Sequence, residues 1–178
     1  TRIANPTIRA LEQNIATLEN GFDGIATSSG MAAITSVYMA LLNAGDHIIS
    51  TAAVYGPARG VLEQDFARFQ VEASFVNTAK LEEIKKAIRP NSKVLYIETP
   101  ANPTMDITDL DACAEIAKEH GLILVVDNTF CTPYLQKPLD LGADVVLHSV
   151  TKFINGHADI VGGVIVTKEA ALYKKIRH

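Results

Sequence analysis

The sequence is poor in cysteine and in aromatic residues. It has two cysteines, no tryptophan and only 6% aromatic residues among 178 positions. Cys113 and Cys131 form no CxxC pair, which excludes a dense disulfide scaffold of the secreted kind and favours a reduced, cytoplasmic setting. No uninterrupted apolar run reaches the roughly 18 residues that a membrane span requires, so we expect no membrane association.

The sequence also lacks a strong excess of charge of either sign. Sixteen Lys and Arg stand against twenty Asp and Glu, and basic residues gather only in the pairs Lys85-Lys86 and Lys174-Lys175. A nucleic-acid-binding surface needs a denser basic patch, so nucleic acid is not expected as a partner. The histidines show no metal-ligand spacing, such as an i, i+4 pair on a helix, and no metal site is expected.

Apolar residues, in contrast, make up 48% of the chain. This content, with a net charge of only −4, excludes intrinsic disorder, and the length supports one domain with its own core. The chain starts at Thr1 without a methionine and ends at His178 inside a helical pattern. We therefore expect it to be a piece of a longer protein.

Short β-branched apolar runs alternate with amphipathic stretches along the chain. The runs predict strands at residues 47–51, 71–76, 93–98, 122–127, 144–149 and 161–167. The amphipathic stretches predict helices at residues 31–42, 81–89 and 110–120. This alternation is typical of a wound α/β fold, in which a mostly parallel sheet carries helices on both faces.

The first twenty residues form a separate segment. Residues 1–7 predict an extended arm, and residues 8–18 predict a helix with Leu11, Ile15 and Leu18 on one face. This segment precedes the first predicted strand and has no evident place on the sheet of its own chain. We expect residues 1–20 to contact a neighbouring subunit and residues 21–178 to form the α/β domain.

Polar residues occur where predicted strands give way to loops, which is where sheets of this kind bind ligands. Ser29-Gly30-Met31 opens a helix whose first N–H groups lack partners, so the segment is either a tight turn or a phosphate site. Asp127 ends an apolar strand. It is either a capping residue or a carboxylate held in a cleft for a cationic partner.

Two further strand ends carry reactive or aromatic side chains. Lys152 follows a predicted strand, with Ser149 and Thr151 just before it. It is either a solvated surface lysine or a desolvated amine, whose lowered pKa makes it a nucleophile toward carbonyls. Tyr55 lies at a turn and is either a packing residue or a platform for a ring. No glycine-rich nucleotide motif accompanies these residues.

These groups together match the needs of one cofactor. A lysine for a Schiff base, an acid for a pyridine nitrogen, hydroxyls and a helix N-terminus for a phosphate, and an aromatic ring are what pyridoxal 5'-phosphate (PLP) requires. We therefore predict that the chain binds PLP.

Several motifs occur here in the order found in a known family. They are Thr1–Thr7, Ser29-Gly30-Met31-Ala32-Ala33, Val54-Tyr55-Gly56, Glu98-Thr99-Pro100-Ala101-Asn102-Pro103, Val126-Asp127-Asn128-Thr129, and Ser149-Val150-Thr151-Lys152-Phe153 with Gly156-His157. Over essentially its whole length the chain resembles the Cys/Met-metabolism enzymes, the PLP-dependent trans-sulfuration enzymes of aminotransferase-like fold (fold type I). Within that family it looks most similar to the methionine γ-lyases.

The resemblance implies a role for each candidate residue. Lys152 would hold PLP as a Schiff base and move protons, and Asp127 would keep the pyridine nitrogen protonated. Tyr55 would stack on the ring and serve as acid and base toward a departing thiol, with its pKa lowered by nearby cations. The remaining groups implied to hold PLP are the amides of Gly30 and Met31, the hydroxyls of Ser149 and Thr151, Asn102 at the phenolic oxygen, and Arg2, which would reach the phosphate of a neighbouring subunit.

The resemblance also implies an activity: α,γ-elimination on L-methionine or a related sulfur amino acid, giving a thiol, 2-oxobutanoate and ammonia. The alternatives are a cystathionine γ-lyase, a γ-replacement enzyme (cystathionine γ-synthase or O-acetylhomoserine sulfhydrylase), or an inactive fragment of one of these. Pro57 stands where methionine γ-lyases often have a cysteine. The family further implies a homotetramer, built as a dimer of dimers, and a C-terminal domain that this chain does not contain.

Overall fold

The fold centres on one seven-stranded sheet, described for residues 5–178 by a computed structural model. Its strand order is β1-β7-β6-β5-β4-β2-β3. The strands are β1 (Asp23–Thr27), β2 (His47–Thr51), β3 (Glu72–Val76), β4 (Ser92–Glu98), β5 (Ile123–Asp127), β6 (Val145–Ser149) and β7 (Gly163–Thr167). Neighbours from β3 to β6 run parallel, whereas β7 is antiparallel to both β6 and β1. The predicted α/β class with a mostly parallel sheet is confirmed.

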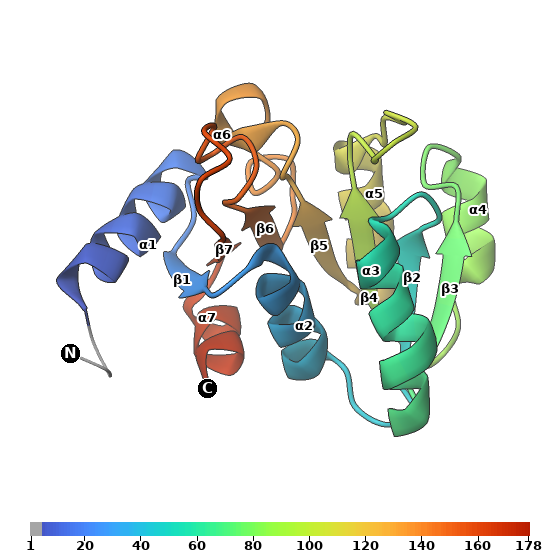
Figure 1. Ribbon diagram of the computed structural model, residues 1–178. Coiled ribbons are helices and arrows are strands. Elements are labelled where there is room, and N and C mark those ends of the chain that lie inside the picture. The colour runs from blue at the N-terminus through green and yellow to red at the C-terminus, as the bar shows by residue number, and fades with distance from the viewer. Residues whose placement is uncertain (1–4) are drawn as a thin grey trace.

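Helices cover both faces of the sheet (Figure 1). The face that we call the α2 face carries α2 (Gly30–Leu41), α3 (Gly56–Gly60), the short turns η1 (Val61–Asp65) and η2 (Phe66–Phe69), and α7 (Ala170–Arg177). The opposite face, which we call the α5 face, carries α1 (Pro6–Leu18), α4 (Leu81–Ala87) and α5 (Leu110–His120). The single turn α6 (Thr132–Leu135) lies at the top of Figure 1. Among the described residues, no helix is long and apolar enough to cross a membrane.

Besides the single turn α6, two parts of this architecture were absent from the prediction. Strand β1 has five residues, one of them Gly24, and it pairs with β7 from the far end of the sequence. The helical stretch from α3 to η2 begins at Gly56-Pro57, a pair that by itself indicates a turn. Local sequence therefore gave too little signal for either segment.

The expectation that the N-terminal helix has no place on its own sheet is wrong. Helix α1 buries Glu12, Ile15 and Ala16 on the sheet side, and the Glu12 carboxylate accepts a hydrogen bond of 3.0 Å from the Ala26 amide of β1. A Cβ at Gly24 would lie 2.4 Å from the Glu12 carbonyl oxygen, so the close approach of helix and strand requires glycine. The contact of residues 1–20 with a neighbouring subunit stays a prediction.

Side-chain alternation along the strands decides which residues reach which face, because successive residues of a strand point to opposite sides. Val94 and Tyr96 of β4 pack in the α2-face core, whereas Leu95 and Ile97 pack in the α5-face core. The same alternation runs through β5 and β6. The last residues of the three strands, Glu98, Asp127 and Ser149, therefore all fall on the α2 face at the carboxyl edge.

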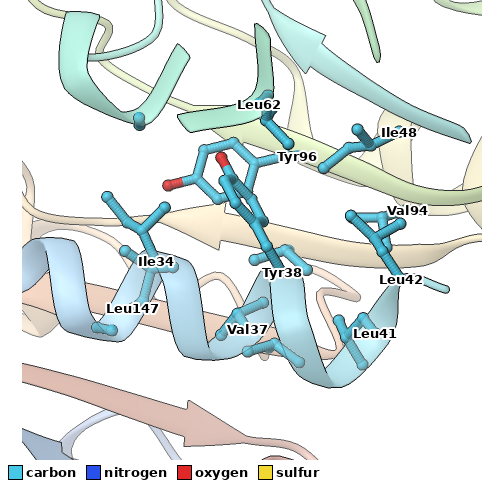
Figure 2. Close-up of a cluster of buried hydrophobic side chains, with 14 of the residues drawn as sticks. Ile34, Val37, Tyr38, Leu41, Leu42, Ile48, Leu62, Val94, Tyr96 and Leu147 are labelled. Atoms are coloured by element: carbon cyan, nitrogen blue, oxygen red, sulfur yellow. The ribbon is translucent and has the colours of Figure 1, made fainter. Parts of the chain in front are cut away.

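Two tyrosines fill the α2-face core just beneath this edge. Figure 2 shows the ring of Tyr38 from α2 beside the ring of Tyr96 from β4, among aliphatic side chains. Both are fully buried, and their ring centroids lie 5.3 Å apart at an interplanar angle of 66°. Such edge-to-face contact is favourable between aromatic rings, and it fixes the Tyr96 ring below the strand ends.

Candidate active site

A cavity of about 280 Å³ opens at the carboxyl edge on the α2 face. It contains all of the predicted cofactor residues except Arg2, whose position lies outside the described residues. These residues are Gly30, Met31, Tyr55, Asn102, Asp127, Ser149, Thr151 and Lys152. The folded chain thus brings together, from strand ends, loops and the start of α2, the residues that the sequence only suggested as a set.

The N-terminus of α2 and the end of β6 lie close together at the cavity. The Ser29 hydroxyl caps α2 by accepting a hydrogen bond of 3.0 Å from the Ala32 amide, so the amides of Gly30 and Met31 are left at the free end of the helix. A Cβ at Gly30 would lie 2.7 Å from the Ser149 Cβ and 2.8 Å from its hydroxyl oxygen. Glycine thus lets two helix amides and the Ser149 hydroxyl converge, an arrangement suited to a phosphate.

Asp127 lies at the floor of the cavity and is almost fully buried. Its Oδ1 accepts hydrogen bonds from the Thr129 amide, at 3.1 Å, and from the Thr129 hydroxyl, at 2.5 Å. Its Oδ2 accepts one from the Tyr96 hydroxyl at 3.3 Å. Burial raises the Asp127 pKa, while the bonds from Thr129, the nearby His148 and the bond from Tyr96 oppose that rise.

Thr129 joins Asp127 to Ser149 at the end of β6. Its hydroxyl donates to Asp127 and accepts a hydrogen bond of 2.9 Å from the Ser149 amide. One side chain therefore fixes both Asp127 and Ser149. Thr129 stood within a motif of the sequence analysis without a role of its own, because its two partners are identified only once β5 and β6 are adjacent.

The loop after β6 departs from expectation in two ways. Lys152 lines the cavity but is exposed, so of the two alternatives for this residue the desolvated amine is not found in this chain. The Thr151 hydroxyl donates to the Gly162 carbonyl oxygen at 3.3 Å and accepts from the Gly162 amide at 3.0 Å. Its single proton is thus engaged with the backbone, and of the two predicted hydroxyls only Ser149 faces the α2 terminus.

Glu98 is a cavity residue that the sequence analysis did not assign. It ends β4 beside Asp127, its neighbour in the parallel ladder, and it is only 4% exposed. Burial, and next the charge of Asp127, raise the Glu98 pKa to about 7. The signal that singled out Asp127, an acid closing an apolar strand, was equally present in the run from Lys93 to Glu98.

The remaining predicted residues take different positions. Tyr55 precedes α3 and is 41% exposed, with its ring at the cavity, and Asn102 lies exposed in the loop after β4. Cys113 lies in the α5-face core, where burial raises its thiol pKa to about 12. Within residues 5–178, no group of three or more His, Cys, Asp or Glu side chains could hold a metal ion.

The residues present fit PLP on two structural observations. Gly30 lies so close to Ser149 that an added Cβ would overlap the Ser149 side chain, and this close approach brings together the amide and hydroxyl donors that a phosphate needs. Two buried acids, Glu98 and Asp127, lie side by side with raised pKa values, so a cationic ring nitrogen would relieve their mutual repulsion. The fold and the cavity define a PLP-binding α/β domain.

The chain belongs to the family described as Cys/Met metabolism PLP-dependent enzymes, whose model matches residues 1–178. It is 53% identical over 176 residues to a cystathionine gamma-lyase of Bacillus subtilis, covering 99% of this chain and 46% of that protein. It is 49% identical over 170 residues to an L-methionine gamma-lyase of Fusobacterium nucleatum, covering 95% of this chain and 43% of that protein.

A solved structure gives the same picture. The crystal structure of cystathionine gamma-lyase from Lactobacillus plantarum complexed with L-serine matches with a TM-score of 0.96 and 46% sequence identity, over 98% of this chain and 46% of that one. The chain therefore spans a little under half the length of these relatives. The family and its PLP cofactor, predicted from sequence motifs, are confirmed.

Proposed function

We propose that this chain is the cofactor-binding part of a PLP-dependent carbon–sulfur lyase that removes a thiol from the γ carbon of a sulfur amino acid. The observation that carries this proposal is one cavity that combines Lys152, Asp127 and the Gly30–Ser149 cradle. The names of its relatives support sulfur amino acids as the substrate class.

In the proposed site, the amides of Gly30 and Met31 and the Ser149 hydroxyl hold the phosphate of PLP, and Asp127 holds the ring nitrogen. When bound, PLP withdraws electrons from the substrate and stabilises negative charge on its α carbon. Lys152, exposed at the rim, attaches the cofactor and then moves protons at the substrate carbons. Tyr55 packs on the ring and donates a proton to the departing sulfur.

The overall reaction balances as an elimination with hydrolysis. The bond between Cγ and sulfur breaks, and the sulfur takes a proton and leaves as a thiol. Water then replaces the amino nitrogen, which leaves as ammonia, and a 2-oxo acid remains. For methionine the products are methanethiol, 2-oxobutanoate and ammonia; for cystathionine the leaving thiol is cysteine.

The attachment residue is tested directly on the encoded protein. After borohydride reduction in the presence of PLP, peptide mass spectrometry should find the cofactor's added mass on Lys152. The Lys152→Ala variant should lose this label and at least about 10³-fold in activity, while exposed Lys118→Ala keeps both. Label on another lysine, or activity that persists in Lys152→Ala, would refute the assignment.

Substrate choice between methionine and cystathionine is tested by product analysis. The encoded protein is incubated with each amino acid, and with O-acetylhomoserine plus a thiol. Formation of a thiol and 2-oxobutanoate from methionine would support methionine γ-lyase activity. Formation of cysteine from cystathionine would support cystathionine γ-lyase activity, the activity named for the relative with 53% identity. If the protein forms a new thioether from O-acetylhomoserine and the thiol, and shows no elimination, both lyase activities are refuted and the protein is a γ-replacement enzyme.

We also propose a homo-oligomer, a dimer of dimers, in a reducing, cytoplasmic setting. Helix α1 supports the first point, because its outer side exposes Ile8, Leu11 and Leu18 although it packs on its own sheet. The two free cysteines, Cys113 and Cys131, support the second. Light scattering coupled to gel filtration should give four chains per particle, and a monodisperse monomer would contradict the proposal.

A further inference from the structure

The carboxylate of Glu98 bridges two loops at the cavity. Its Oε2 accepts a hydrogen bond of 2.7 Å from the Tyr55 amide, and its Oε1 accepts one of 3.0 Å from the Asn102 amide. The Tyr55 amide belongs to the loop between β2 and α3, and the Asn102 amide belongs to the loop after β4. The Glu98 amide in turn donates to the Thr51 hydroxyl at the end of β2, at 3.2 Å.

The chemistry of this bridge explains why the residue is a glutamate. Both partners are backbone N–H donors, and only an ionised carboxylate accepts on both of its oxygens. A glutamine would turn its own NH₂ group toward one of the two amides, and one part-buried donor would lose its partner. Because each Glu98 oxygen already holds a loop, the side chain is engaged in fixing the backbone rather than free to exchange protons with a substrate.

We propose that Glu98 is a positioning residue of the cofactor site: its carboxylate fixes the loops after β2 and β4, and so holds Tyr55 and Asn102 in place at the cavity. This proposal depends on the proposed function in one respect only, namely that the ligand of the cavity is PLP. The bridging contacts themselves belong to the chain without any ligand.

The charge of Glu98 is linked to what binds beside it. Its pKa is raised to about 7, first by burial and then by Asp127, so the bridge is only partly ionised near neutral pH. The ionisable groups near Glu98 are Asp127 on β5 and the buried Tyr38 on α2 and Tyr96 on β4, and Tyr55 before α3 and Lys152 after β6 line the same cavity. A cationic ring nitrogen at Asp127 would offset the nearest negative charge and favour ionised Glu98.

The test compares the encoded protein with its Glu98→Gln variant, which keeps the shape of the side chain but accepts on one oxygen only. The matched control is Glu119→Gln, which makes the same change of charge at an exposed position of α5. Glu98→Asp is the second variant: it keeps the charge but is one methylene shorter, so it also releases one loop. If Glu98→Gln does not fold, the hydrogen-exchange experiment is carried out with Glu98→Asp, in which one of the two loops should exchange faster.

The first readout is amide hydrogen exchange without cofactor at pH 8. In Glu98→Gln, peptides covering residues 53–58 and 100–105 should exchange about tenfold faster than in the unmodified protein, since a bond to a charged acceptor is lost. Peptides from α5 should be unchanged, and Glu119→Gln should behave as the unmodified protein throughout. Unchanged exchange in both loops would overturn the proposal.

The second readout is the affinity for PLP, measured by absorbance titration at pH 8 and pH 6. Glu98→Gln should bind PLP about tenfold or more weakly at pH 8. The ratio of the PLP affinity of the unmodified protein to that of Glu98→Gln should be about threefold or more smaller at pH 6 than at pH 8. At pH 6, Glu98 of the unmodified protein is itself largely protonated. Titrations of PLP itself are common to both proteins and cancel in this ratio.

The two readouts separate this proposal from the proposed function. If the unmodified protein binds no PLP, the proposed function fails, and the exchange experiment still decides whether Glu98 fixes the two loops. If PLP binds equally well to both proteins, or the affinity ratio is the same at pH 8 and pH 6, the positioning role is refuted while the PLP assignment stands.

Discussion

The two faces of the sheet reach the same carboxyl edge with different chemistry. On the α2 face the edge carries two acids side by side, Glu98 and Asp127, at the wall of an open cavity. On the α5 face the polar side chain at that edge is His148, whose Nε2 lies 2.6 Å from Glu19 Oε1 with both side chains fully buried. One face places like charges together, whereas the other joins a carboxylate to an imidazole.

This difference separates a binding site from a structural contact. The acid and the imidazole of the α5 face meet within the chain, and Glu19 also accepts a hydrogen bond of 3.0 Å from Asn128. The pair connects the residue after α1 to β6 and β5. The acids of the α2 face have raised pKa values, so their ionised forms are poorly compensated by the chain and gain from a cation. Changes on the α5 face should therefore act on stability, and changes on the α2 face on cofactor binding.

The largest expected effect is on the α5 face. Replacing Glu19 by alanine leaves the His148 ring and the Asn128 amide without their buried partner, and the free energy of unfolding should fall by about 3–5 kcal/mol. Urea unfolding of the cofactor-free protein measures this change. The control Glu82→Ala removes an exposed partner of Lys85 and should change stability by about 0.5 kcal/mol or less. Equal effects of the two variants would contradict the comparison.

The second largest effect is expected for Asp127 on the α2 face, where one substitution should weaken PLP binding but increase the stability of the cofactor-free protein. Asp127→Asn should weaken PLP binding by about 10- to 100-fold, because a charged partner of the ring nitrogen is lost. The same change should raise the free energy of unfolding of the cofactor-free protein at pH 8, by about 0.5–2 kcal/mol.

The sign of this stability change follows from the raised pKa of Asp127. Because the carboxyl binds its proton more tightly when folded, the ionised form opposes folding at pH values above the folded-state pKa. The advantage of the asparagine variant should therefore disappear as the pH falls toward about 4, the ordinary pKa of aspartic acid. Thermal unfolding at several pH values measures it, and a variant less stable at pH 8 would contradict the account.

The smallest expected effect concerns the hydroxyl beneath Asp127. Tyr96→Phe removes one donor to Oδ2, at 3.3 Å, and leaves the ring packing against Tyr38 intact. PLP binding should weaken by about two- to tenfold, with a change in unfolding free energy of about 1 kcal/mol or less. Tyr134→Phe, at a ring that is 92% exposed, is the control and should do neither. A large loss of stability without a change in binding would place Tyr96 among the structural residues.

The fold was predictable where the signal is local. The runs of β2, β4, β5 and β6 were found to within one or two residues, and helix α5 spans Leu110–His120 as predicted. Strand β1 was missed because its stability comes from pairing with β7, which lies near the other end of the chain. Helix α1 buries Glu12 because Ala26 and Arg177 supply its partners, and hydrophobic periodicity carries no information on either.

The identity of most site residues was predictable from the sequence, but their exposure and hydrogen bonds were not. Asp127, Ser149 and Lys152 were identified because they lie at or just after the ends of predicted strands. Strands of one mostly parallel sheet end at the same edge, which suggested that these residues meet. The sequence could not predict that Lys152 is exposed or that Gly162 engages the Thr151 hydroxyl, since both depend on how the loop after β6 folds. Glu98 closes an apolar strand as Asp127 does and could have been identified by that signal, but its bridging contacts could not, because its partners are backbone amides, which every residue except proline carries.

The most direct test of the central claim, that the carboxyl edge of the α2 face holds PLP, is the dissociation constant of PLP for Gly30→Ala measured beside Gly60→Ala. A Cβ at Gly30 would lie within 3 Å of the Ser149 side chain, whereas a Cβ at Gly60 meets no atom within 4 Å. We predict that Gly30→Ala weakens PLP binding by about 100-fold or more, since the added Cβ forces Ser149 and the α2 terminus apart and separates the phosphate donors, and that Gly60→Ala binds normally. PLP binding within about twofold of normal in a folded Gly30→Ala protein would contradict the account.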